Sequence, residues 1–72
     1  MINIKKLKTN MQKFLPNWHV FSFRLDAKNV DVVGIKKEKT HEYYAFGIDK
    51  FHDKDCVQKM FNILKNIPLN ER

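Results

Sequence analysis

The sequence has little cysteine, glycine or proline and no long apolar run. Cys56 is the only cysteine, so no intramolecular disulfide can form, and we expect a reducing, cytoplasmic compartment. The first residues, Met-Ile-Asn-Ile-Lys-Lys, are too polar for a signal peptide, and no stretch is long and apolar enough to span a bilayer. We therefore expect no membrane partner. With two glycines, two prolines, 43% hydrophobic and 31% charged residues, the composition is typical of an ordinary globular domain.

Acidic residues are absent from the first third of the chain, where every charged side chain is a cation. The whole chain has a net charge of +6, whereas the part from Asp26 onward is nearly balanced. A positive charge gathered in one segment favours an anionic partner, either nucleic acid or an acidic protein surface. The cations that precede Asp26 are Lys5, Lys6, Lys8, Lys13 and Arg24.

The chain is expected to form one small α+β domain over residues 1–72. Asn3 and Asp53 can cap two amphipathic helices, and Pro16 and Pro68 can end them. Each helix has one apolar stripe, so both should cover the same face of a three-stranded antiparallel sheet, in a two-layer sandwich. A domain this small has a limited core, so a dimer or a bound partner can add stability. The periodicity predicts a helix over 4–15, strands over 18–25, 30–37 and 41–49, and a helix over 53–67.

The faces of the sheet depend on the turn after the first strand. Asp26 to Asn29 form a polar turn in which Asn29 can adopt the left-handed conformation that a three-residue hairpin loop needs. With this loop, and with a loop of two or four residues between the second and third strands, the face under the helices carries Phe21, Phe23, Leu25, Val33, Ile35, Tyr44, Phe46 and Ile48. The open face then carries Trp18, Val20, Arg24, Val32, Gly34, Lys36, His41, Tyr43 and Ala45.

This open face is one candidate binding surface, because it mixes aromatic rings with cations. Bases can stack on Trp or Tyr while Arg and Lys neutralise phosphates, as on single-stranded nucleic-acid platforms. Two other interpretations need no nucleic acid: Trp18 and Tyr43 can pack against the sheet itself, or the face can be buried in a homodimer. Apolar neighbours on this face favour protein over base, namely Val20, Val32 and Ala45. The predicted binding residues are Trp18, Arg24, Lys36, His41 and Tyr43.

The outer side of the first helix is the second candidate surface. Lys5, Lys6 and Lys13 lie opposite the apolar stripe and can reach phosphates as flexible point charges. A merely solvated helix surface has the same pattern.

No catalytic site, metal site or cofactor is expected. His52 and Cys56 are four residues apart, which is half of a zinc site without the further ligands that zinc needs. Cys56 also falls on the apolar stripe of the last helix, as an inert core thiol would. His41 beside Lys36 across a hairpin is the one pair suited to the acid–base chemistry of a ribonuclease.

The order helix, three strands, helix is also that of double-stranded RNA-binding domains and of some small ribonuclease toxins. The RNA-binding family has a lysine cluster at the start of its last helix. This chain reads Asp53-Lys54-Asp55-Cys56 there, and its two acids would repel phosphate. The sequence therefore predicts no membership of that family.

The sequence predicts a non-enzymatic binding module for DNA or RNA, or for a nucleic-acid-handling protein. It would bind through the basic first helix and the open sheet face. A first alternative is an inhibitor from a phage or mobile element that docks on a host protein, since abundant Lys, Asn and Ile suggest an AT-rich genome. A second alternative is a small ribonuclease-like toxin.

Overall fold

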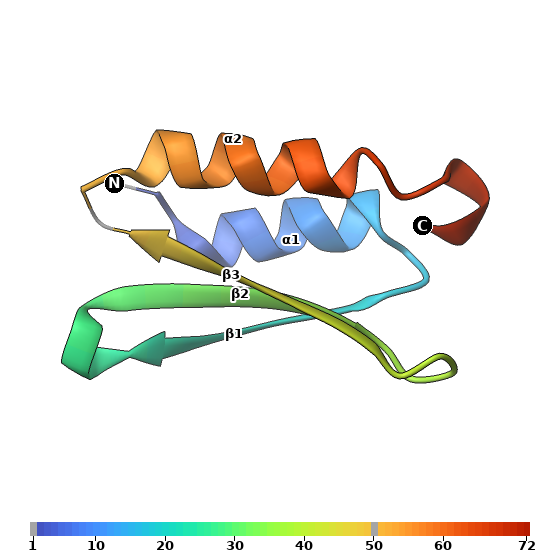
Figure 1. Ribbon diagram of the computed structural model, residues 1–72, viewed down its shortest axis with the longest axis horizontal. Helices are drawn as coiled ribbons and strands as arrows, with labels where there is room; N and C mark the ends of the chain where they lie inside the picture. The colour runs from blue at the N-terminus through green and yellow to red at the C-terminus, as the bar shows by residue number, and fades with distance from the viewer. Residues whose placement is uncertain (1, 50) are drawn as a thin grey trace.

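Two helices lie on one face of a three-stranded antiparallel sheet in the computed structural model, which describes residues 2–49 and 51–72 (Figure 1). The elements are α1 (Ile4–Phe14), β1 (His19–Leu25), β2 (Val30–Lys37), β3 (Glu42–Asp49) and α2 (Asp53–Leu64), with short 3-10 turns η1 (Asp26–Lys28) and η2 (Leu69–Glu71). The strands are arranged in the order β1-β2-β3. This architecture confirms the predicted fold class. None of the described helices is long and apolar enough to cross a membrane.

Local sequence signals set the ends of α1. The side-chain oxygen of Asn3 accepts a hydrogen bond from the backbone N–H of Lys6 at 3.1 Å, which caps the first turn as predicted. The helix ends at Phe14, and the backbone N–H of Leu15 still donates to the carbonyl of Met11. Pro16 follows directly and disfavours helical geometry at Leu15.

The start of α2 differs in detail from the prediction. Asp53 and Asp55 lie in its first turn, where negative charge suits the helix dipole. The N-cap is His52, however, and the Asp53 carboxylate instead accepts a hydrogen bond from the backbone N–H of Ile2 at 3.2 Å. This contact ties the segment before α1 to the start of α2.

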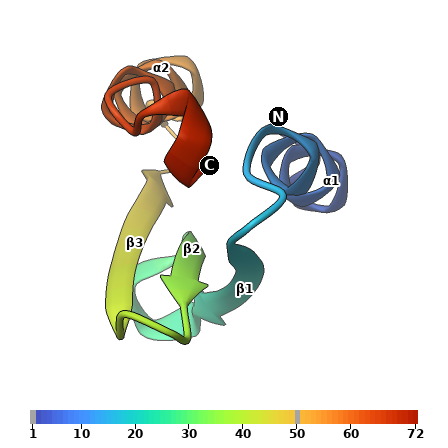
Figure 2. The ribbon, with the colours of Figure 1, turned by 90° about the vertical axis from the view of Figure 1, so that its right-hand side faces the viewer.

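The helices stand over opposite edges of the sheet, α1 over β1 and α2 over β3 (Figure 2). The turn η2 lies between their ends in the same view. A T-shaped contact between the rings of Phe14 and Phe61, with centroids 6.2 Å apart, connects the two helices. The buried core between helices and sheet consists of Leu7, Met11, Leu15, Trp18, Val20, Val33, Ile35, Ile48, Met60 and Leu64.

The predicted faces are correct for β2 and β3 but wrong for β1. Leu25 pairs with Val30, so the loop between them has four residues rather than three. Side chains alternate along a strand, and a shift of one residue therefore moves every β1 side chain to the other face. Val20 consequently lies under the helices, whereas the open face receives Phe21, Phe23 and Leu25.

Candidate functional site

The open face of the sheet carries a strip of neighbouring rings, which we call the aromatic strip: His19, Phe21, Phe23 and Tyr43. The ring of Phe21 is central. Its centroid lies 6.4 Å from those of His19 and Phe23, with interplanar angles of 16° and 7°. Across the sheet it stacks on Tyr43, with a centroid distance of 5.6 Å and an angle of 27°. Three rings of β1 are thus nearly parallel, and a fourth comes from β3.

A glycine on the neighbouring strand makes this arrangement possible. Gly34 is the cross-strand partner of Phe21. A Cβ atom at position 34 would lie 2.2 Å from Cζ of Phe21 and 2.6 and 2.7 Å from its two Cε atoms. The Phe21 ring therefore lies directly over the Gly34 backbone, in space that any other residue would fill.

The rings beside Phe21 are open to solvent. Phe23 is 45% exposed and Tyr43 is 56% exposed, whereas Phe21 between them is half-buried. Leu25 continues the exposed apolar surface along β1, and Val32 is covered on the same face. Large apolar side chains gathered on one surface of a small protein are typical of a binding site.

One end of the aromatic strip, at Lys36, carries charged side chains of both signs. Lys36 lies opposite His19 on one side and Tyr43 on the other, all on the open face. The loop after β2 adds Lys39, and His41 closes this loop in a left-handed conformation with φ of 57°. The acids at this end are Glu38 and Glu42. At the other end of the strip, Asp49 pairs with Val30.

The residues predicted for the open face separate into two groups. Tyr43 and Lys36 lie on it, and His41 lies in the loop at the Lys36 end, where the three line a shared shallow hollow. Trp18, predicted on this face, is under the helices instead and only 4% exposed. The prediction for Trp18 was wrong because the reversal of β1 turns its even-numbered residues inward.

Interactions on the helix side explain why Trp18 is buried there. Its indole N–H donates to the backbone carbonyl of Glu71 at 2.9 Å. Its ring lies 6.0 Å from that of Tyr44, and the ammonium of Lys37 lies 5.1 Å from its centroid. Trp18 thus holds η2 against the sheet and is not available to a base.

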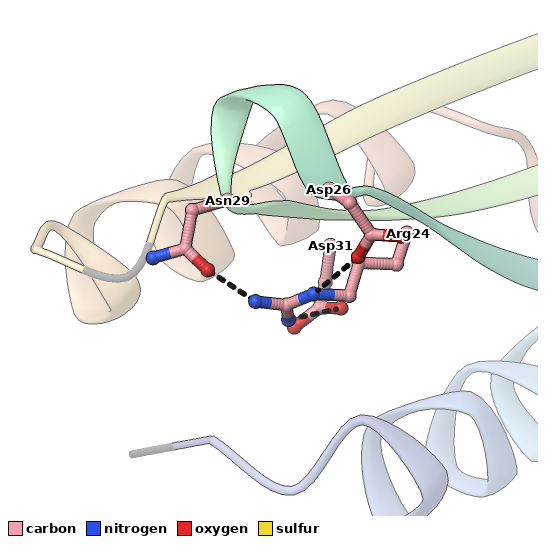
Figure 3. A network of polar contacts seen from close by, with 4 residues as sticks. All are labelled: Arg24, Asp26, Asn29 and Asp31. Carbon is pink, nitrogen blue, oxygen red and sulfur yellow. Dashed lines mark hydrogen bonds and ion pairs between the residues drawn. The ribbon is translucent and has the colours of Figure 1, made fainter.

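Arg24 was also predicted on the open face, and this prediction was wrong for the same reason. Figure 3 shows its guanidinium within the β1–β2 hairpin. Nε lies 3.1 Å from Oδ1 of Asp26 and Nη1 lies 3.2 Å from Oδ1 of Asp31, while Nη2 donates to the side-chain oxygen of Asn29. Two carboxylates neutralise the Arg24 charge, so its guanidinium stabilises the hairpin and is not free to bind a phosphate.

The three lysines predicted on the first helix are exposed on the outer side of α1. Lys5, Lys6 and Lys13 lie away from the buried Leu7 and Met11. The helix α1 belongs to the layer that covers one face of the sheet (Figures 1 and 2). These lysines lie opposite its buried stripe, whereas the aromatic strip lies on the other face of the sheet. The structure therefore separates the two candidate surfaces.

Asp49, His52 and Cys56 lie near the start of α2. The pKa of Asp49 is lowered, first because the backbone N–H of Phe51 donates to its carboxylate at 2.8 Å, and further by His52, whose Nδ1 lies 3.5 Å from Oδ2. Cys56 is half-buried against the core. Over residues 2–49 and 51–72, no three His, Cys, Asp or Glu side chains gather to hold a metal ion.

Sequence reasoning missed Phe21 and Phe23 as surface residues. The signal that could have found them is Gly34 in the middle of a strand rich in Val and Ile, because a strand glycine often marks the close approach of another group.

Comparisons of the chain with models of protein families, with curated proteins and with solved structures found no match. What the protein binds must therefore be inferred from its own surfaces.

Proposed function

We propose that this protein binds single-stranded nucleic acid on the open face of its sheet. Bases stack on Phe21, Phe23 and Tyr43, and backbone phosphates lie beside Lys36. The observation that supports the proposal most is the set of parallel, partly exposed rings around Phe21. Such rings stack on any base, since every base has a π-face.

The spacing of side chains along a β-strand suits a single-stranded nucleic acid. Alternate residues repeat at about 6.6 Å, twice the rise per residue, so rings along β1 can be occupied in turn by the splayed bases of an extended strand. A duplex keeps its bases stacked inside and offers none to the strip. The net charge of +6 adds attraction to phosphates that weakens with salt.

Fluorescence anisotropy with dye-labelled single-stranded DNA and RNA oligonucleotides tests the proposal. Tyr43→Ala should weaken binding by about 1–3 kcal/mol, because one stacking ring is lost. The matched control is Tyr44→Ala, which removes a tyrosine of similar exposure, 45%, from the helix side of the same strand. Equal losses in both variants, or no binding by the unaltered protein, would refute the proposal.

A homodimer through the open face is the second candidate, favoured by the aliphatic part of this surface. Leu25 is 43% exposed there, and its cross-strand partner Val30 is half-buried beside it. Sedimentation distinguishes the two: a dimer that Phe23→Ala dissociates supports burial of the face in protein, whereas a monomer that binds oligonucleotide supports base stacking.

A further inference from the structure

The outer side of α1 presents an uncompensated positive surface, which we call the lysine surface: Lys5, Lys6 and Lys13. All three side chains are exposed, and α1 contains no acidic residue. Within the part of the chain that the structure describes, none of their ammonium groups lies within ion-pair distance of a carboxylate. The charge of this surface is therefore available to an external polyanion.

Two of these lysines are placed against the stability of their own helix. Lys5 and Lys6 lie in the first turn of α1, where the positive end of the helix dipole disfavours cations. The first turn of α2 follows the stabilising rule, with Asp53 and Asp55. A residue choice that breaks a local stability rule is expected where function requires it.

The lysine surface cannot contact a short nucleic-acid strand that is bound on the aromatic strip. The helices occupy one side of the sheet and the strip the other, so the two surfaces point away from each other (Figures 1 and 2). A short strand lying on the strip therefore leaves the lysines free. Lys5 and Lys13 are eight residues apart, or about 12 Å along the helix, enough to contact separate phosphates.

We propose that the lysine surface is a second polyanion site, through which one molecule holds two nucleic-acid strands and accelerates the pairing of complementary ones. This inference rests on the proposed function of the sheet face. Lysines contact phosphates and leave the bases of the second strand free to pair with the part of the first strand that extends beyond the aromatic strip. Holding both strands on one molecule converts their encounter into a local event at high effective concentration.

Strand annealing tests the proposal, using two complementary single-stranded DNA oligonucleotides with a donor and an acceptor dye. The test variant is Lys5→Gln, Lys6→Gln, Lys13→Gln. The matched control is Lys54→Gln, Lys59→Gln, Lys65→Gln, which removes three exposed lysines from α2 and its C-cap and also lowers the net charge from +6 to +3. Thermal melts establish that both variants fold.

We expect the unaltered protein and the α2 control to accelerate annealing. The α1 variant should lose roughly tenfold of that acceleration. Its binding of a single labelled strand, measured by fluorescence anisotropy, should change much less. Equal losses in both triple variants would mean that net charge alone acts, and undiminished annealing by the α1 variant would exclude the lysine surface; either result overturns the inference. If a single strand binds and Tyr43→Ala weakens it, the proposed function survives that failure. If no strand binds, both fail.

Discussion

The ring of Phe21 lies over the backbone of Gly34, its partner on the adjacent strand, at a distance that leaves no room for a Cβ atom. The Phe21 ring occupies this space, and the rings of His19, Phe23 and Tyr43 surround it. The glycine is thus a spatial requirement of the aromatic strip and not of a turn, since no described glycine has a positive φ.

Gly34→Ala should displace the Phe21 ring and destabilise the protein by about 1–3 kcal/mol, as overpacking does. Chemical denaturation measures the effect. The double variant Gly34→Ala, Phe21→Ala should recover part of the loss, because the clash is absent. Gly47→Ala is the control: its Cβ meets only Cγ1 of Val30 at 3.4 Å, so little change is expected. Equal costs at positions 34 and 47 would contradict the assigned packing.

The two ends of α1 should respond oppositely to the same charge change. Lys6→Glu places an acid near the positive end of the dipole, three residues after the N-cap Asn3, and should stabilise the protein by about 0.3–1 kcal/mol. Lys13→Glu in the last turn should destabilise it by a similar amount. Melting temperatures at low salt provide the comparison. Shifts of the same sign would show that the dipole does not govern these sites.

His41 should tolerate only residues that accept a left-handed backbone. Its φ is 57°, so His41→Asn or His41→Gly should keep or raise the melting temperature, whereas His41→Val should cost about 1–2 kcal/mol. Thr40→Val, beside it in the same loop but without a positive φ, controls for the loss of a polar surface group. A harmless His41→Val would mean that this loop has another conformation in solution.

Asp49 should make folding sensitive to acid. Its pKa is lower in the folded protein than in the unfolded chain, mainly through the hydrogen bond from Phe51. Its stabilising contribution is therefore complete above the unfolded pKa, near 4 for an ordinary Asp, and disappears as the pH falls through the folded value. The stability difference between the protein and Asp49→Asn, measured by thermal melts, should shrink across this acid range. A difference that is constant with pH would refute this assignment.

Removal of residues 69–72 should expose Trp18. The indole N–H loses its acceptor at Glu71, and the backbone N–H of Asn17 loses the carbonyl of Arg72 at 2.7 Å. We expect a lower melting temperature and a shift of tryptophan emission to longer wavelength. Leu69→Ser, which alters a side chain that is 82% exposed, should change neither quantity. An unshifted emission spectrum in the truncated protein would show that η2 does not cover Trp18.

The elements of this protein follow from local features of its sequence. The cap at Asn3 and the break at Pro16 are effects of neighbouring residues, and the predicted β2 has the same bounds as the observed one. The predicted faces of β2 and β3 were correct, because their loop was allowed four residues, the length observed between Lys37 and Glu42. The exposure of the α1 lysines could also be predicted from the sequence, because the side of a helix opposite its apolar stripe faces solvent.

The tertiary structure alone decided which face of β1 is buried. Leu25 to Asn29 permit loops of three or four residues, and the local preferences of Asn29 fit both. The choice between them depends on contacts outside the loop: Trp18 with Glu71, Arg24 with Asp31, and Phe21 over Gly34. Because strand side chains alternate with a period of two, this one-residue choice moved Trp18 and Arg24 off the open face and brought the aromatic strip onto it.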